Sequence, residues 1–139
     1  MESSGPSPAN PVQNRASVLV VDDDPSVREL FRAALGRRGY SVTCAEEYEE
    51  AAAILGHRVF DLACIDLDLA GLRGLEGLEL ISDLHVRRPE SRILVETGNA
   101  DPLVHRACYE RGADAVYLKS GSLLELQRLV EEVLAEESR

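Results

Sequence analysis

The chain has 139 residues, of which 45% are hydrophobic, and its formal net charge is −10 at pH 7. This length and apolar fraction fit one globular domain with an ordinary core. Duplex nucleic acid and anionic membrane surfaces bind clustered Lys and Arg, so the negative charge argues against both as direct partners. We find neither an apolar run of the roughly 18 residues that a membrane span needs nor an apolar signal segment, and we expect a cytoplasmic protein.

Residues 1–16 are rich in Ser, Pro and Asn. Such a segment buries too little apolar surface to offset the entropy of ordering, so we predict a flexible tail at 1–16 and one folded domain at 17–139. From residue 17 on, short apolar runs alternate with longer segments of helical period. The predicted strands are 17–21, 42–45, 61–65, 92–97 and 115–118, and the predicted helices are 25–38, 46–56, 77–88, 102–111 and 122–137.

The signals at the ends of these segments agree with this division. Asp24 before Pro25 predicts a helix N-cap followed by proline at the first helical position. Gly39, Pro89 and Gly112 mark helix ends. The runs VLVV and LACI are apolar throughout, as parallel strands covered on both faces are. Five strand–helix units in series predict a doubly wound α/β domain.

The three cysteines, Cys44, Cys64 and Cys108, are odd in number and show no C-x-x-C spacing. This pattern argues against a disulfide framework and against a zinc site, so we expect reduced cysteines that serve in packing. We therefore expect the functional residues among the other polar side chains.

Polar side chains follow four of the five predicted strands. Strands joined by right-handed crossovers point the same way, so their carboxyl ends meet at one edge of the sheet. The residues at these ends are Asp22, Asp23 and Asp24 after the first strand, Asp66 and Asp68 after the third, Thr97 and Gly98 after the fourth, and Lys119 after the fifth. We therefore expect acids, a hydroxyl and an ammonium to lie together.

Most of these residues have an ordinary explanation when taken alone. Asp24 fits a helix cap, Thr97 a strand residue and Lys119 a surface charge. Asp66 differs because it ends an apolar run, where an unpaired carboxylate is costly to bury. Several strand-end carboxylates repel one another unless a cation lies among them, and Mg²⁺ prefers oxygen ligands of this kind. Taken together, the residues predict a metal-dependent site.

Four motifs, in this order along the chain, resemble the signatures of the response-regulator receiver domain of two-component signalling. They are VLVVDDDPSVREL, DLACIDLDLAG, ILVETGNAD and GADAVYLKS, and the resemblance runs from about residue 17 to the last helix. It implies a flavodoxin-like fold, with a doubly wound parallel sheet of five strands in the order 2-1-3-4-5 and five helices.

The resemblance also implies a chemistry. Asp66 would accept a phosphoryl group from a sensor histidine kinase or a small phosphodonor, which would switch a surface read by a downstream effector or output domain. Mg²⁺ would be held by Asp23 and Asp66 directly, by Asp22 through water and by the main-chain carbonyl of Asp68. Thr97 would hydrogen-bond the phosphoryl group, and Lys119 would pair with it. Such a domain is not an enzyme, although it assists its own phosphorylation and dephosphorylation.

These roles agree with elementary electrostatics. A carboxylate that attacks phosphorus meets an anion, so a metal ion and an ammonium are needed to neutralise charge in the transition state. The product adds roughly −1.5 to −2 charges at neutral pH, and this charge can draw Thr97 and its loop toward the phosphoryl oxygens.

Some departures from the family pattern concern the loops of the site. Ala70 stands where the family commonly has proline, and the loop at 71–77 is longer than usual, which predicts a mobile loop. Ser120 follows Lys119 where the family has a proline after a cis peptide bond. A cis bond before serine costs about 2.5–4 kcal/mol, so one expectation is that Lys119 is displaced.

Other departures concern the strands. Val116 stands at the aromatic switch position of the family, and Tyr117 is expected on the opposite strand face, which argues against coupling through a swinging ring. Glu96 before Thr97 adds a negative charge near the site. The sequence does not indicate whether this charge helps or hinders.

Two other classes of function stay open at this point. One is an interaction module of the same fold that signals without phosphorylation. Against it, the five expected polar positions are all filled, by Asp22, Asp23, Asp66, Thr97 and Lys119. The other is a phosphatase, because IDLDL resembles the DxD pair of haloacid-dehalogenase-like enzymes. That family usually carries its DxD on the first strand, which makes this alternative the weakest.

The helix predicted at 122–137 carries a wide apolar face. Its apolar positions are Leu123, Leu126, Val130 and Val133, widened by Leu124, Leu129 and Leu134. Core packing explains most of this face. The excess, beside the helix at 102–111, predicts a docking surface, and a homodimer through these two helices is one hypothesis.

Overall fold

The structure, a computed structural model, describes residues 15–68 and 74–136. The described strands are β2 (Ser17–Val21), β3 (Ser41–Ala45), β4 (Leu62–Asp66), β5 (Arg92–Thr97) and β6 (Ala115–Leu118). All pairings between them are parallel, and the order is β3-β2-β4-β5-β6, which is 2-1-3-4-5 counted along the chain. The predicted fold class is confirmed.

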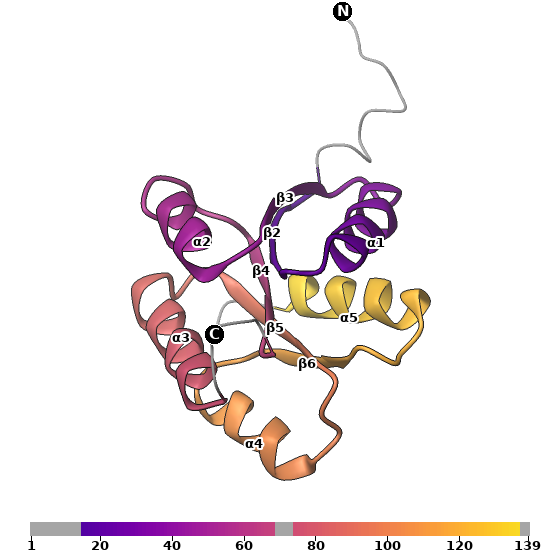
Figure 1. Cartoon of the computed structure of the whole chain (residues 1–139). Coiled ribbons are helices and arrows are strands. Elements are labelled where there is room, and N and C mark those ends of the chain that lie inside the picture. The colour runs from indigo at the N-terminus through magenta and orange to yellow at the C-terminus, as the bar shows by residue number, and fades with distance from the viewer. Residues whose placement is uncertain (1–14, 69–73, 137–139) are drawn as a thin grey trace, which may run out of the picture.

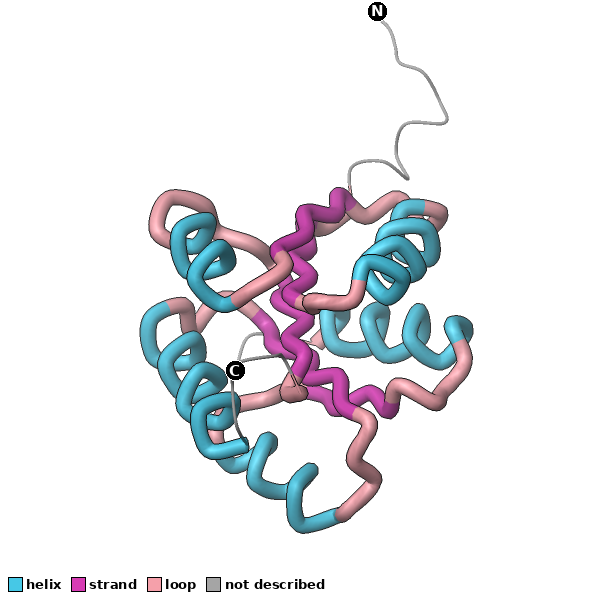
Figure 2. The backbone as a smooth tube through the Cα atoms, viewed as in Figure 1, coloured by secondary structure: helices cyan, strands magenta, loops and turns pink. Residues whose placement is uncertain are grey.

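The described helices cover both faces of this sheet. They are α1 (Pro25–Gly36), α2 (Tyr48–Leu55), α3 (Gly74–Arg87), α4 (Pro102–Glu110) and α5 (Leu123–Ala135). Figure 1 shows α1 and α5 on one face of the sheet and α2, α3 and α4 on the other. Figure 2 shows the strands as the layer between them. This is the doubly wound arrangement of right-handed crossovers.

The central strand β4 shows why the sheet is covered on both sides. Every residue of β4 is buried, and its side chains alternate between two apolar clusters. Cys64 packs with Phe31 and Leu126 on the face of α1 and α5, whereas Ile65 packs with Ile81 on the face of α3 and α4. Full burial of an aliphatic side chain contributes about 1.5–3 kcal/mol, so this run holds the sheet in register.

The helix ends follow local chemistry. The Asp24 carboxylate accepts a hydrogen bond from the Ser26 amide at 2.8 Å, and Pro25 opens α1, as predicted. α1 ends at Gly36, two residues before the predicted end, and Gly39 has a φ of 90° in the turn that follows. α3 begins at Gly74, three residues before its predicted start. Such differences are typical where a boundary depends on tertiary contacts.

Two sequence predictions concern segments that the structure describes only in part. Residues 1–14 of the predicted tail lie outside the described residues. Arg15, near its end, contacts the fold, because its guanidinium stacks 4.6 Å from the centroid of the Tyr40 ring and lies 2.9 Å from Glu131 of α5. Ala70 and residues 71–73 of the loop predicted to be mobile also lie outside the described residues, whereas residues 74–77 of that loop belong to α3.

Among the described helices, none combines the length and the apolar character that a membrane crossing requires.

Candidate functional site

The carboxyl ends of four strands meet at one edge of the sheet and bring the predicted polar residues together. Asp66 ends β4 and lies beside Glu96 of β5 in the parallel register. The Lys119 amide donates to the Thr97 carbonyl at 2.9 Å, which continues the pairing of β6 with β5 past the last strand residue. This register fixes the point at which each side chain leaves the sheet.

Asp66 lies at the centre of the site. Its side chain is 1% exposed, and its Oδ1 atom accepts hydrogen bonds from Lys119 Nζ and from the Asp68 amide, both at 2.9 Å. Burial raises the pKa of Asp66 above its ordinary value of 3.8, and the bonds from Lys119 and Asp68 offset part of that effect. Both donors bind the same oxygen, and among the described contacts the other oxygen accepts no hydrogen bond.

Lys119 reaches the site although it lacks the usual proline after it. The peptide bond between Lys119 and Ser120 is trans, and the ammonium still contacts Asp66. The expected displacement of Lys119 is therefore wrong. Burial alone would lower the pKa of Lys119, but the hydrogen bond to Asp66 and the negative charges of Asp66, Asp22 and Glu96 raise it above its ordinary value. Lys119 is a cation at neutral pH.

The acidic residues form a cluster that fits a divalent cation. One carboxylate oxygen each of Asp22, Asp23 and Asp66 lies within 4.8 Å of the others. Asp22 is fully buried, and its Oδ2 atom has no hydrogen-bond partner among the described residues, with Lys119 Nζ 4.0 Å away. A buried oxygen without a donor, next to two further carboxylates, is the hard donor set that Mg²⁺ prefers.

Asp22 itself is held by its backbone neighbours. Its Oδ1 atom accepts a hydrogen bond from the Asp24 amide at 2.9 Å, and the Arg28 guanidinium donates to the Asp22 carbonyl at 2.8 Å. The turn before α1 thus serves two purposes, because Asp24 caps the helix and its amide orients the neighbouring acid. The contribution of Arg28 could not be predicted from the sequence, since its position in a helix carries no signal of a contact with the site.

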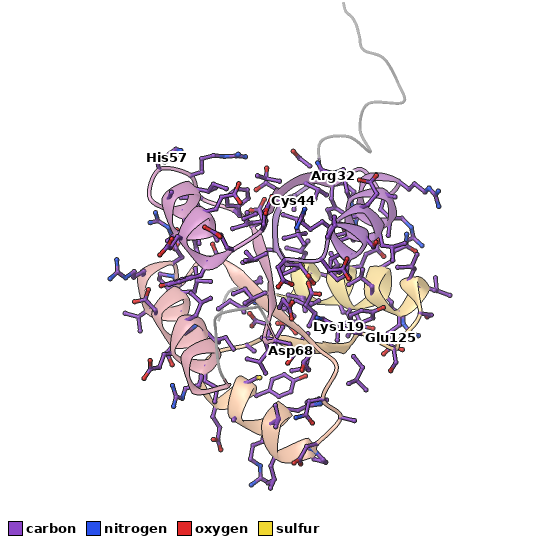
Figure 3. The ribbon with its side chains drawn as sticks, in the orientation of Figure 1. Arg32, Cys44, His57, Asp68, Lys119 and Glu125 are labelled. Carbon is purple, nitrogen blue, oxygen red and sulfur yellow. The ribbon has the colours of Figure 1, made fainter. Side chains whose placement is uncertain are left out.

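Asp68 engages Thr97 and Gly98 on the neighbouring strand end. Its Oδ2 atom accepts from the Gly98 amide at 2.9 Å and from the Thr97 hydroxyl at 3.2 Å, and Lys119 Nζ lies 4.0 Å away. Figure 3 shows Asp68 and Lys119 next to each other at this edge. These side-chain contacts of Asp68 were not predicted, because the direction of a side chain in a turn after a strand cannot be deduced from spacing.

Glu96 is a fully buried carboxyl below the acidic cluster. Neither of its oxygens has a hydrogen-bond donor among the described residues. Burial raises the pKa of Glu96 well above its ordinary value of 4.5, and the contact with Asp22 raises it further. Two carboxylates offer each other only acceptors, so this contact becomes a hydrogen bond when Glu96 carries a proton. Glu96 therefore keeps its proton to a higher pH than an exposed glutamic acid does.

Tyr117 is fixed below the site. Its ring lies edge-on to Phe31 at a centroid distance of 6.2 Å, and its hydroxyl donates to the carbonyls of Gly121 at 2.8 Å and Ser122 at 3.0 Å. Val116 packs with the cluster on the opposite face of the sheet. The two side chains lie on opposite faces of the sheet, as the strand period predicts. The ring of Tyr117 is held in the core by these contacts.

The chain is similar to known proteins over most of its length. The response regulator receiver domain family matches residues 18–131, which is most of the chain. The chain belongs to this family. It is a receiver domain of two-component response regulators, a phosphorylation-dependent signalling module.

Individual relatives agree with this assignment. The transcriptional regulatory protein AruR of Pseudomonas aeruginosa is 41% identical over 104 residues, which are 73% of this chain and 42% of AruR. A crystal structure of a CheY-like receiver domain protein from Methanospirillum hungatei has a TM-score of 0.77 at 30% identity, over 85% of this chain and 92% of that chain. This receiver domain spans less than half the length of AruR.

A third relative bears on the chemistry of the family. A crystal structure of a response regulator from Burkholderia pseudomallei, with a phosphorylated aspartic acid, calcium ion and citrate, has a TM-score of 0.72 at 29% identity. The match covers 88% of this receiver domain and 76% of that chain. The haloacid-dehalogenase alternative finds no support, because the DxD motif lies on β4, the third described strand in chain order.

The buried Glu96 predicts how stability depends on pH. Folded Glu96 keeps its proton at pH values where the unfolded side chain has lost it, so this residue lowers the free energy of unfolding as pH rises above about 4.5. Glu96→Gln has no proton to lose. We expect its free energy of unfolding at pH 7 to exceed that of the wild type by about 1 kcal/mol or more. The gain should shrink as pH falls toward 4.5. Urea denaturation between pH 4.5 and 8, with a chelator present, measures this difference.

Glu90→Gln is the control for this experiment, because Glu90 is exposed in the loop after α3. It separates the loss of any negative charge from the loss of the buried one. A stability difference between Glu96→Gln and the wild type that stays constant with pH would contradict the protonation of Glu96.

Proposed function

We propose that Asp66 is the phosphoacceptor of this receiver domain. The proposal rests on the environment of the Asp66 carboxylate. This carboxylate is buried, is bound by Lys119 at 2.9 Å and lies close to two further acids. A carboxylate in this position is fixed in direction and partly desolvated, and both conditions favour attack on phosphorus. The phosphorylated aspartic acid of the Burkholderia relative supports the same chemistry.

The transfer follows from this arrangement. The free carboxylate oxygen of Asp66 forms a bond to phosphorus while the bond from phosphorus to the donor breaks. With a phosphohistidine donor, the imidazole nitrogen keeps the electron pair of the P–N bond; with acetyl phosphate, acetate leaves with the pair of the P–O bond. Lys119 stays paired with the developing negative charge, which lowers the barrier. In this sense the domain assists its own phosphorylation and dephosphorylation without being an enzyme.

The acidic cluster would hold Mg²⁺. Asp23 and Asp66 would bind it directly, Asp22 would bind it through water, and the main-chain carbonyl of Asp68 would complete the set of protein ligands. When bound, the ion neutralises charge on the phosphoryl oxygens and on the crowded carboxylates. The chain's own contribution is to orient these oxygens, through the amide of Asp24 on Asp22 and the amide of Asp68 on Asp66.

Thr97 and Lys119 would bind the phosphoryl group of phosphorylated Asp66. The Thr97 hydroxyl lies at the end of β5, where it can turn toward a phosphoryl oxygen, and Lys119 already contacts Asp66. Residues that follow Thr97 lead directly into α4, so a movement of this loop changes the surface beside α4. A phosphorylation-independent interaction module has less support, because the five polar residues are present and lie around one point.

The partners follow from the same chemistry. We propose a sensor histidine kinase as the phosphodonor and a downstream effector or output domain as the reader, in the cytoplasm. AruR is a transcriptional regulatory protein, and the part of it that this chain matches is 42% of its length. The net charge of −10 supports an output that does not involve direct contact of this domain with nucleic acid or a membrane.

A surface formed by α4, β6 and α5 is the proposed reading surface. β6 is the edge strand of the sheet, and α4 and α5 flank it on its two faces. Apolar side chains are exposed on both helices: Leu103 is 69% exposed on α4, and Leu124 is 66% exposed on α5. The other predicted excess residues, Leu129 and Leu134, pack against the core instead. We propose that phosphorylation strengthens self-association through this surface.

The assignment of the phosphoacceptor predicts the result of a simple substitution. Asp66→Asn removes the nucleophile and keeps the shape, so we expect no gain of mass after incubation with acetyl phosphate and Mg²⁺. The wild type should gain one phosphoryl group by intact-mass spectrometry. Asp83→Asn is the matched control, because Asp83 is an acid on α3 that pairs with Arg87. Equal phosphorylation of wild type and Asp66→Asn would refute the assignment.

The acidic cluster predicts stabilisation by Mg²⁺. A ligand that binds only the folded state at tenfold its Kd adds ~1.4 kcal/mol, so Tm should rise by about 3–6 °C for a domain of this size. Asp23→Ala should abolish this rise in a thermal melt with millimolar Mg²⁺, while Glu29→Ala, an acid on α1 paired with Arg32, should keep it. A rise that persists in Asp23→Ala would place the ion elsewhere.

The reading surface predicts phosphorylation-dependent association. Addition of beryllium fluoride with Mg²⁺, as a mimic of the phosphoryl group, should raise the sedimentation coefficient at high protein concentration. Leu103→Glu should prevent that rise by placing a charge in the apolar surface. Val86→Glu is the control, since Val86 is 75% exposed on α3, away from α5. A wild type that stays monomeric with the mimic would remove the dimer and leave a separate partner.

A further inference from the structure

The side chain of Asp68 occupies the donors among which a phosphoryl oxygen would be bound. Its Oδ2 atom accepts from the Gly98 amide at 2.9 Å and the Thr97 hydroxyl at 3.2 Å, and it lies 4.0 Å from Lys119 Nζ. A hydroxyl, a backbone amide and an ammonium around one anionic oxygen are also the donors that bind phosphoryl oxygens in proteins. The carboxylate of Asp68 therefore imitates the group that the site would receive.

The side chain of Asp68 can leave without disturbing the acceptor. Its main-chain amide is fixed by the hydrogen bond to Asp66 Oδ1 at 2.9 Å. Its side chain is 46% exposed, so the carboxylate borders solvent. Rotation of the side chain toward solvent releases Thr97 and Gly98 while the backbone of the turn stays where it is.

We propose that the Asp68 carboxylate is a built-in competitor of the phosphoryl group, which holds Thr97 and Gly98 until a phosphoryl oxygen displaces it. The inference rests on the proposed function, because it takes Asp66 as the phosphoacceptor. No covalent bond changes at Asp68; one anionic acceptor replaces another on the same donors. The competition, together with the repulsion between the two anions, raises the level of phosphodonor that switches the domain.

Competition for donors must be distinguished from simple repulsion, since removal of any nearby negative charge favours an incoming anion. Glu125 provides the matched control. It lies in the first turn of α5, at the same edge of the sheet as Lys119 (Figure 3). Among the described residues, its side chain makes no hydrogen bond to Thr97 or Gly98. Glu125→Gln therefore removes a negative charge from this edge and leaves both donors as they are.

The first measurement is the affinity for beryllium fluoride at saturating Mg²⁺, by calorimetric titration, with the Mg²⁺ affinity of each variant measured separately. We expect Asp68→Ala to bind about tenfold more tightly than the wild type, Asp68→Asn to lie between them, and Glu125→Gln to stay within about twofold of the wild type. In a Thr97→Val background, the gain from Asp68→Ala should fall to about threefold, because one contested donor is gone. Equal gains from Asp68→Ala and Glu125→Gln would overturn the competition.

The second measurement needs neither metal nor phosphodonor. Amide hydrogen exchange at Gly98 reports the bond from Gly98 to Asp68 directly. We expect exchange at Gly98 to be about tenfold faster in Asp68→Ala than in the wild type, and unchanged in Glu125→Gln. An unchanged rate in Asp68→Ala would overturn the inference.

The two measurements separate the inference from the function on which it rests. If the wild type fails to bind beryllium fluoride, the proposed function fails and the competition fails with it, whatever the exchange rate at Gly98. If the wild type binds the mimic but Asp68→Ala fails to bind it more tightly, or fails to exchange faster at Gly98, only the role of Asp68 is refuted.

Discussion

The ion pair between Lys119 and Asp66 is the interaction on which the site depends. Asp22, Asp66 and Glu96 are all buried at one edge of the sheet, and Lys119 lies 2.9 Å from Asp66 and 4.0 Å from Asp22. Buried charges are tolerated only when they are paired or neutralised. The parallel register supplies this pairing, because the Lys119 amide binds the Thr97 carbonyl and so places the ammonium above Asp66.

One lysine does not balance three acids, and the protein neutralises the remainder in different ways. Burial of both its oxygens raises the pKa of Glu96 and so favours the neutral, protonated form. Asp22 has one oxygen that accepts from the Asp24 amide, and in the proposed site its other oxygen would face a cation through water. The carboxylates are therefore not equivalent, although the sequence presents them as similar aspartates and glutamates at strand ends.

Much of the fold and of the site could be predicted from the sequence, because both depend on local patterns that the sequence shows clearly. Apolar runs such as that of β4 specify buried strands, and the parallel direction of the strands brings their carboxyl ends together. The displacement of Lys119 was predicted wrongly because the ladder between β5 and β6, not the residue after the lysine, decides where it points. The contacts of Asp68 depend on side-chain rotation in a turn, which no periodicity describes.

The fixed position of the Tyr117 ring in the core has a consequence for how this domain transmits a signal. A ring that is hydrogen-bonded to the Gly121 and Ser122 carbonyls and packed on Phe31 cannot change its rotamer without opening the core. Under the proposed function, the main chain that follows Thr97 and leads into α4 is then the route by which the site would change the surface. A partner would then recognise the shape of the backbone surface instead of an exposed aromatic side chain. The residues at the start of α4 would determine which partner binds.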